Sequence, residues 1–306
     1  MNNYPLKGSK KILIFLSSLF NQVTWSFYCL RFKMRIVDAQ IHLWESGNPS
    51  RAHLQESSFV SERAIKLMDE AGVSAAVIHL APWDPNCHQV ALDAVKKHPK
   101  RFAMLGELLL TDPKAKGQIG HVLAEPGVLG LRYIFINNPE KQLLHNGDID
   151  LLWSAAEEFS VPITLMATDS LSLIGDIAER HPGLKITIDH LGGRGGLTTL
   201  KDHEAMVHMP HLVALAKHSN IAVKATGAPA YSDEPYPFPI MQSYIRQIFD
   251  AYGPDRIFWG TDITKMKCSW KDCIDMFTEE LSWLSQEDKR LVMGDAVCSW
   301  WGWDRD

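Results

Sequence analysis

The chain has few cysteines, little net charge and no cysteine pair with metal-binding spacing. Five cysteines occur among 306 residues, an odd number, and none forms a Cys-x-x-Cys pair. This pattern argues against a disulfide framework or a zinc knuckle and favours a reducing, cytoplasmic environment. The formal charge is only −5 and no long basic run is present, which argues against a nucleic-acid partner.

A long hydrophobic run is also missing near the N-terminus. Lysines precede an apolar run at 12–16, but polar residues at 21 and 22 interrupt it before the ~20 residues of a membrane span are reached. No small-x-small cleavage site follows. We interpret residues 1–33 as an N-terminal extension, either upstream of a natural start at Met34 or a weak signal or anchor. Residues 34–306 are expected to form the folded domain.

The rest of the sequence alternates short apolar runs with amphipathic helical stretches. The expected strands are Ile36–His42, Ala75–Leu80, Phe102–Leu108, Val128–Phe135, Pro162–Met166, Lys185–His190, Ile221–Thr226 and Arg256–Thr261. The expected helices are Ser61–Ala71, Asn86–His98, Pro113–Ala124, Ile149–Phe159, Leu171–His181, His203–His218, Ile240–Tyr252 and Trp270–Leu284. Eight strands, each followed by a helix, predict an α/β fold of the (β/α)₈ TIM-barrel type.

An open, doubly wound sheet is the structural alternative. Such sheets carry a Gly-x-Gly-x-x-Gly turn after the first strand, which this sequence lacks. The glycine-rich loop Gly192–Gly196 follows the sixth expected strand and has no Walker lysine, so it is weak support for phosphate binding.

In a TIM barrel, reactive side chains gather at the C-terminal ends of the strands, where the loops build a pocket. Polar side chains stand at several of these ends. They are Asp38, Gln40, His42, Arg132, His190, Lys224 and Asp262. Any one of them could be a structural group, but their joint occurrence at one end of the barrel predicts an active site there.

Three of these ends resemble the strand ends of the amidohydrolase-related family. The matching segments are Asp38–Trp44, Ile188–Gly193 and Trp259–Asp262, and Pro126–Arg132 resembles the family's fourth strand. The family includes 2-pyrone-4,6-dicarboxylate lactonase, sugar lactonases of the fuconolactonase type and aminocarboxymuconate semialdehyde decarboxylases. The resemblance covers residues 35–306.

Metal-dependent members of this family bind their ion through two first-strand histidines, a fifth-strand histidine and the eighth-strand aspartate. The resemblance places Gln40, His42 and Asp262 at three of these positions, and the fifth strand has no histidine. A carboxamide is a poor ligand for a transition metal, and a catalytic zinc site usually has three protein ligands. We therefore predict a metal-independent enzyme, with weak binding of a divalent ion at His42 and Asp262 left open.

For lactone hydrolysis, a base must activate water and a donor must stabilise the acyl oxygen. We assign Asp262 as the general base and His190 as the donor to the carbonyl oxygen. His42 is expected to position Asp262 or the carbonyl. These three residues are the predicted catalytic set.

The predicted substrate-binding residues surround this set. The resemblance assigns Arg132 to a substrate carboxylate or carbonyl, and Arg194 in the glycine loop could add a second guanidinium or be a solvated charge. Lys224 could face the pocket or pair with a core carboxylate. Trp270 could belong to an aromatic wall or to the packing. Gln40, in the place of a lost metal ligand, is the fifth candidate.

Two long loops are expected near the mouth. Ala228–Pro239 is rich in proline, which predicts an ordered loop over the C-terminal end. Glu45–Phe59 follows the first strand and carries Arg51 and His53. Each loop could reach the substrate or serve as surface cover.

The sequence thus predicts a cytoplasmic hydrolase, specifically a metal-independent lactonase for a small carboxylated or aromatic-derived cyclic ester. Its only expected partner is this small molecule, with no nucleic acid and no membrane for the barrel itself, and homo-oligomerisation is left open. A decarboxylase with a metal near Asp262 and His190 is the alternative enzyme. A degenerate barrel that binds a ligand without turnover is the alternative from another class.

Overall fold

Residues 35–306 form one compact unit. The computed structural model describes Met1 and residues 34–110, 114–195 and 198–304. The predicted N-terminal extension, residues 1–33, lies outside the described residues apart from Met1. Among the described residues, no helix is both long and apolar enough to cross a membrane.

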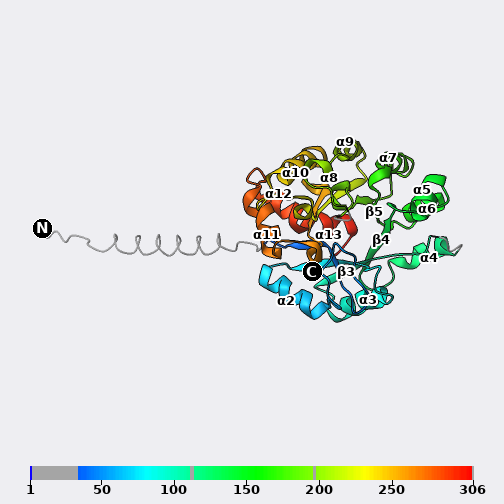
Figure 1. The fold of residues 1–306 in the computed structure, drawn as a ribbon, viewed down its shortest axis with the longest axis horizontal. Coiled ribbons are helices and arrows are strands. Elements are labelled where there is room, and N and C mark those ends of the chain that lie inside the picture. The colour runs from blue at the N-terminus through cyan, green and yellow to red at the C-terminus, as the bar shows by residue number, and fades with distance from the viewer. Residues whose placement is uncertain (2–33, 111–113, 196–197, 305–306) are drawn as a thin grey trace. The chain divides into compact units, whose positions relative to one another are not determined.

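Eight parallel strands pair in the order in which they occur along the chain (Figure 1). They are β1 (Val37–His42), β2 (Ala75–His79), β3 (Phe102–Gly106), β4 (Val128–Ile134), β5 (Ile163–Met166), β6 (Ile186–Ile188), β7 (Ile221–Thr226) and β8 (Ile257–Gly260). Nearly every strand residue is buried, as is usual for strands covered on both faces. The predicted (β/α)₈ barrel is confirmed, with each strand within two residues of its expected ends.

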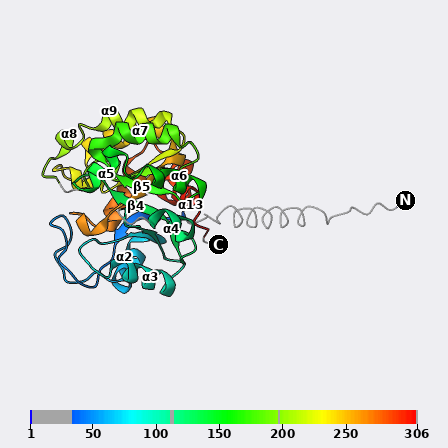
Figure 2. The same cartoon turned by 90° about the vertical axis from the view of Figure 1, so that its right-hand side faces the viewer.

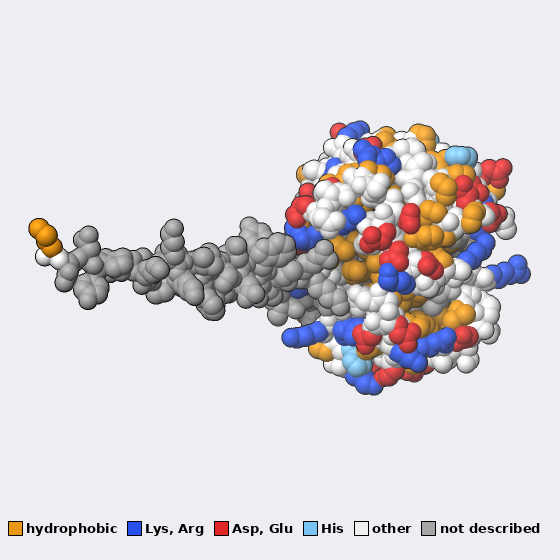
Figure 3. All heavy atoms as spheres, turned by 90° about the vertical axis from the view of Figure 1, so that its left-hand side faces the viewer, with side chains coloured by type: hydrophobic (Ala, Val, Ile, Leu, Met, Phe, Trp, Pro, Cys, Tyr) orange, Lys and Arg blue, Asp and Glu red, His pale blue; other side chains and the backbone are white. Residues whose placement is uncertain are grey.

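Helices surround the strands. They are α2 (Ser61–Ala71), α3 (Cys87–Lys97), α4 (Ala115–Val122), α5 (Glu140–Asn146), α6 (Asp150–Glu158), α7 (Leu171–Arg180), α8 (Asp202–Ala205), α9 (Met209–Ala214), α10 (Pro239–Tyr252), α11 (Trp270–Asp275), α12 (Gln286–Arg290) and α13 (Ala296–Trp301). Figure 2 shows α2 and α3 on the opposite side of β4 and β5 from α7, α8 and α9. On the face drawn in Figure 3, acidic and basic side chains are interspersed.

Two expected helices are wrong in extent. His203–His218 is divided into α8, α9 and a 3₁₀ turn at Leu215–Lys217, because Pro210 is accommodated in the first turn of a new helix, α9, rather than inside a continuous one. Trp270–Leu284 is α-helical only to Asp275 and continues as a π-helical segment, Met276–Glu280.

The two ends of the barrel differ in chemistry. At the N-terminal end, Val37, Ala75, Leu129 and Phe258 pack against α13 and Trp303 in one apolar cluster. This end is therefore sealed by apolar contacts, and the polar side chains lie at the C-terminal end.

The last strand closes against the first through polar contacts. The Asp262 amide, directly after β8, donates to the Gln40 carbonyl at 2.9 Å, and the Thr261 amide donates to Asp38 Oδ1 at 2.9 Å. Asp38 Oδ2 also accepts from Trp270 Nε1 at 2.8 Å. Asp38 thus joins β1, β8 and α11, and this clasp holds Gln40 beside Asp262.

Candidate active site

Asp262 is the centre of the polar cluster at the C-terminal mouth. Its backbone is left-handed, with φ 54°, and its carboxylate is fully buried. Oδ2 lies 2.6 Å from Lys265 Nζ and accepts from Gln40 Nε2 at 3.3 Å. Oδ1 is buried and has no hydrogen-bond partner among the described residues. One oxygen of this buried carboxylate therefore keeps an unused hydrogen-bond acceptor.

Three histidines surround the same carboxylate. His42 Nε2 and His53 Nδ1 lie 3.7 and 3.9 Å from Oδ1, and His190 Nε2 lies 3.9 Å from Oδ2. The structure thus brings the three predicted catalytic residues, Asp262, His190 and His42, within a few ångströms of one another. Whether they perform the chemistry belongs to the proposal below.

Gln40 connects Lys224 to Asp262 and His190 through hydrogen bonds. Its Oε1 accepts from Lys224 Nζ at 2.6 Å, which fixes the amide because a lysine can only donate. The Nε2 group then faces Asp262 Oδ2 and His190 Nε2, the latter at 3.2 Å. His190 Nε2 is consequently the acceptor, and its proton lies on Nδ1, which has no partner among the described residues.

Lys224 is fully buried and pairs with a core carboxylate, one of its two expected alternatives. Its Nζ lies 2.7 Å from Asp189 Oδ1 and 3.1 Å from His79 Nε2. Burial lowers the pKa of Lys224 to about 8, although Asp189 opposes this shift. Gln40 contacts Asp262 and His190 directly, Lys224 is linked to them through Gln40, and neither lines the Arg132 pocket.

Burial also keeps the histidines neutral. It lowers the pKa of His190 to about 3 and that of His53 to about 4, and it lowers the pKa of His42 well below its ordinary value. His42 Nδ1 donates to the His79 carbonyl at 2.9 Å, so its Nε2 presents a lone pair toward Asp262. The Asp262 cluster therefore combines a carboxylate with uncharged imidazoles.

The loop after β6 presents His190 in a left-handed backbone conformation, with φ 51°. Gly195 must be a glycine here, because a Cβ at this position would lie 2.7 Å from the His190 ring. Tyr231 supports the turn: its hydroxyl accepts from the Gly195 amide at 2.6 Å and donates to the His190 carbonyl at 3.1 Å. Tyr231 belongs to the expected proline-rich loop, which is thereby connected to the site.

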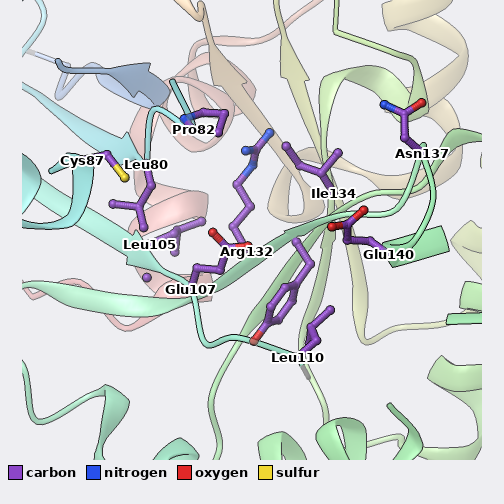
Figure 4. A pocket seen from close by; sticks show the side chains of 12 residues that line it. Leu80, Pro82, Cys87, Leu105, Glu107, Leu110, Arg132, Ile134, Asn137 and Glu140 are labelled. Carbon is purple, nitrogen blue, oxygen red and sulfur yellow. The ribbon is translucent and has the colours of Figure 1, made fainter. Parts of the chain in front are cut away.

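Arg132 lines a separate pocket of about 230 Å³ beside the cluster. Its Nε donates to Asp189 Oδ2 at 2.8 Å. In Figure 4, Arg132 lies in the middle of the lining residues, with Glu107 on one side and Glu140 on the other. Burial raises the pKa of Glu107, while Arg132 opposes the shift. The pocket thus offers both a cation and hydrogen-bond acceptors to a ligand.

The two other predicted binding residues lie elsewhere. Arg194 is partly exposed and donates to Asp169 Oδ2 at 2.5 Å, at the rim of the mouth. Trp270 is buried and bonded to Asp38, on the outer side of the clasp between β1 and β8. The structure does not bring either residue to the Asp262 carboxylate.

Two members of the cluster were not among the predicted site residues. His53 comes from the long loop after β1, whose ends are paired by Trp44 and Phe59, and His53 Nδ1 lies 2.7 Å from Thr264 Oγ1. Lys265 lies in the turn after β8. His53 and Lys265 both lie in loops. In the sequence, they were indicated only by the polar composition of the segments next to a strand end.

Comparison with known proteins identifies the family. The sequence profile of the amidohydrolase family matches residues 37–296. The chain belongs to this family. An L-fucono-1,5-lactonase from Burkholderia ambifaria is 20% identical in an alignment 289 residues long, which covers 88% of this chain and 96% of that relative. This membership confirms the family and the hydrolase class predicted from the sequence.

Solved structures confirm the fold. An amidohydrolase from Burkholderia multivorans with bound zinc has a TM-score of 0.72 at 15% identity, covering 88% of this chain and 99% of that one. A probable 2-pyrone-4,6-dicarboxylic acid hydrolase from Acinetobacter baumannii with bound citric acid has a TM-score of 0.70 at 16% identity, covering 88% and 100%.

Because a structural relative holds zinc, we asked which side chains of this chain could bind a metal ion. His42, His53 and Asp262 each offer a ligand atom, and these atoms lie within 4.8 Å of one another. Two imidazoles and the Asp262 carboxylate, whose Oδ1 has no partner among the described residues, fit a divalent transition ion. This corrects the expectation that only two donors remain, because His53 supplies a third from outside the strands.

Proposed function

We propose that the chain is a lactonase that opens a small cyclic ester and does not require a metal ion. The observation that carries the proposal is the Asp262 carboxylate, buried, paired on one oxygen with Lys265 and free on the other. It is linked to Arg132, which lines the pocket, through contacts of Asp189, Lys224 and Gln40. The relation to an L-fucono-1,5-lactonase supports the reaction class.

Asp262 can act as the base because its carboxylate form is favoured at neutral pH. Burial alone would raise the pKa of Asp262, but Lys265 and the neighbouring histidines hold it well below its ordinary value. In the proposed reaction Asp262 Oδ1 takes a proton from water as the water oxygen bonds to the lactone carbonyl carbon. The ring C–O bond then breaks, and Asp262 returns the proton to the departing ring oxygen.

His190 stabilises the charge that develops on the carbonyl oxygen. Its Nδ1–H has no partner within the described part of the chain, and the ring is held by Gln40 on the other nitrogen. A donor oriented before the reaction is worth more than one that must reorganise. Gln40 and Lys224 act here as positioning residues, and Arg132 binds a carboxylate or carbonyl of the substrate through its terminal nitrogens.

The charges of the cluster support a reaction without a metal. Lys224 pairs with Asp189, and Lys265 pairs with Asp262, so each of these buried carboxylates already faces a cation of the protein. A divalent ion at His42, His53 and Asp262 would place two further positive charges close to Lys265. If one were bound by His42, His53 and Asp262, it would polarise a carbonyl or activate water. We propose that Lys265 supplies the positive charge instead.

The test is a panel of substrates offered to purified protein, with and without a chelator. The panel contains neutral sugar lactones, carboxylated pyrones and aromatic carboxylates, and ring opening and CO₂ release are followed separately. The proposal predicts ring opening of a lactone that survives chelation and is lost in Asp262→Asn. CO₂ release that disappears on chelation would instead support a decarboxylase, and no turnover of any member would support a ligand-binding barrel.

A further inference from the structure

Two cysteine thiols meet at the start of α11, on the outer side of the β1–β8 clasp. Cys268 Sγ and Cys273 Sγ lie 3.6 Å apart. Cys268 is partly exposed and lines a surface hollow of about 330 Å³ together with Leu67, Ile263 and Trp270. Cys273 is buried behind it. One thiol is thus accessible from solvent, and the other can be reached only through the first.

The helix cap explains why the thiols face each other. Ser269 is the N-cap of α11 and forms a capping box with Asp272. Residues just before an N-cap and in the first turn after it commonly pack together as an apolar staple. Cys268 and Cys273 occupy those two positions, so the cap itself holds the sulfurs in contact. An aliphatic pair would serve the packing equally well without offering a reactive group.

We propose that Cys268 and Cys273 form a redox-active dithiol, which exchanges with small disulfides of the glutathione type to give an intramolecular disulfide. The Cys268 thiolate attacks one sulfur of the incoming disulfide, forming a mixed disulfide and releasing one small thiol. Cys273 then loses its proton and attacks Cys268 Sγ, which releases the second small thiol. The protein loses two electrons and two protons, and the small disulfide gains them.

The pKa values of the two thiols are shifted in opposite directions, and the shifts favour attack by Cys268 before Cys273. A hydrogen bond from the Cys273 thiol lowers the pKa of Cys268. The same hydrogen bond, together with burial, raises the pKa of Cys273 well above its ordinary value. Cys268 is therefore the better initial nucleophile and Cys273 the resolving thiol. The sulfurs need to approach by roughly 1.5 Å to reach a disulfide bond length.

The helix α11, at whose start the pair lies, is anchored to the barrel. Trp270 Nε1 is held by Asp38, and the Cys273 carbonyl accepts from Trp259 Nε1 at 3.2 Å. These contacts fix α11 to both β1 and β8. Closing the sulfurs therefore requires side-chain rotation at the cap rather than displacement of the helix.

The test uses the full chain, reduced and then equilibrated in buffers of reduced and oxidised glutathione. Tryptic cleavage after Lys267 and Lys271 separates Cys268 from Cys273, so only the disulfide links peptide 268–271 to peptide 272–289. The proposal predicts this linked pair in the oxidising buffers and its loss on reduction. In Cys273→Ser the glutathione adduct should stay on Cys268, and in Cys268→Ser the buried Cys273 should stay unmodified.

Cys87→Ser is the matched control, because Cys87 is also partly exposed. It should leave the linked pair unchanged. Equal glutathione adducts on Cys87 and Cys268 without linked peptides would overturn the proposal, as would complete resistance of Cys268 in every buffer. The readout is covalent and does not depend on the lactonase proposal.

Discussion

The two sides of the barrel mouth are built differently. Around Asp262, polar side chains are buried and bound to one another, and Asp262 Oδ1 and His190 Nδ1 are left without a hydrogen-bond partner among the described residues. Around Arg132, the side chains line an open pocket that includes Glu107 and Glu140. In the proposed mechanism, the buried groups around Asp262 hold one another in position for the reaction. The accessible groups around Arg132 recognise the substrate.

The largest expected effect comes from neutralising the Asp262 carboxylate, which lies at the centre of the buried cluster. Asp262→Asn keeps the size of the side chain and removes the base, so turnover of a lactone substrate should fall by on the order of 100-fold or more. Steady-state kinetics measure the loss, and a thermal melt checks that the fold survives. Near-native turnover would make His190 the next candidate base.

Lys265 tests whether a protein cation does the work of a metal. In Lys265→Met the buried Asp262 loses its closest cation, so its pKa should rise, because burial favours the neutral acid. Activity should then be lost as pH falls through this raised pKa. Wild type should lose activity only at a lower pH. A pH–rate profile that Lys265→Met leaves unchanged would contradict the proposed role.

Arg132 separates binding from chemistry. Arg132→Met removes a charge-assisted contact to the substrate, so KM should rise by on the order of tenfold, with a smaller change in kcat. The opposite split, with kcat falling and KM constant, would place Arg132 in the transition state. Arg194→Ala is the matched control, since Arg194 pairs with Asp169 at the rim, and it should change neither constant.

Lys224 should give kcat a pH dependence at the alkaline end. Burial lowers the pKa of Lys224 to about 8, and its charged form orients Gln40 and pairs with Asp189. Lys224 is protonated below this pH and neutral above it, so kcat should decline as pH rises through about 8. Arg132 repels the Lys224 ammonium, so Arg132→Met should move this alkaline limb to higher pH. A limb that moves to lower pH would contradict the assignment.

The barrel was readable from the sequence because its strands are apolar runs with polar ends. β6 and β8 illustrate this, and His42, His190 and Asp262 were predicted because strand ends converge on one mouth. His53 and Lys265 were not assigned, since their positions depend on how loops fold back rather than on strand periodicity. The role of Gln40 was also hidden, because it depends on Lys224 fixing the orientation of an amide.

The central claim is that Lys265, rather than a metal, supports Asp262. The most direct measurement combines zinc and manganese analysis of the purified chain with lactone turnover before and after chelation. We predict much less than one ion per chain and unchanged turnover after chelation. Gln40→His should not alter either result. One ion per chain, with turnover that chelation abolishes and added zinc restores, would contradict the account and assign His42, His53 and Asp262 as ligands.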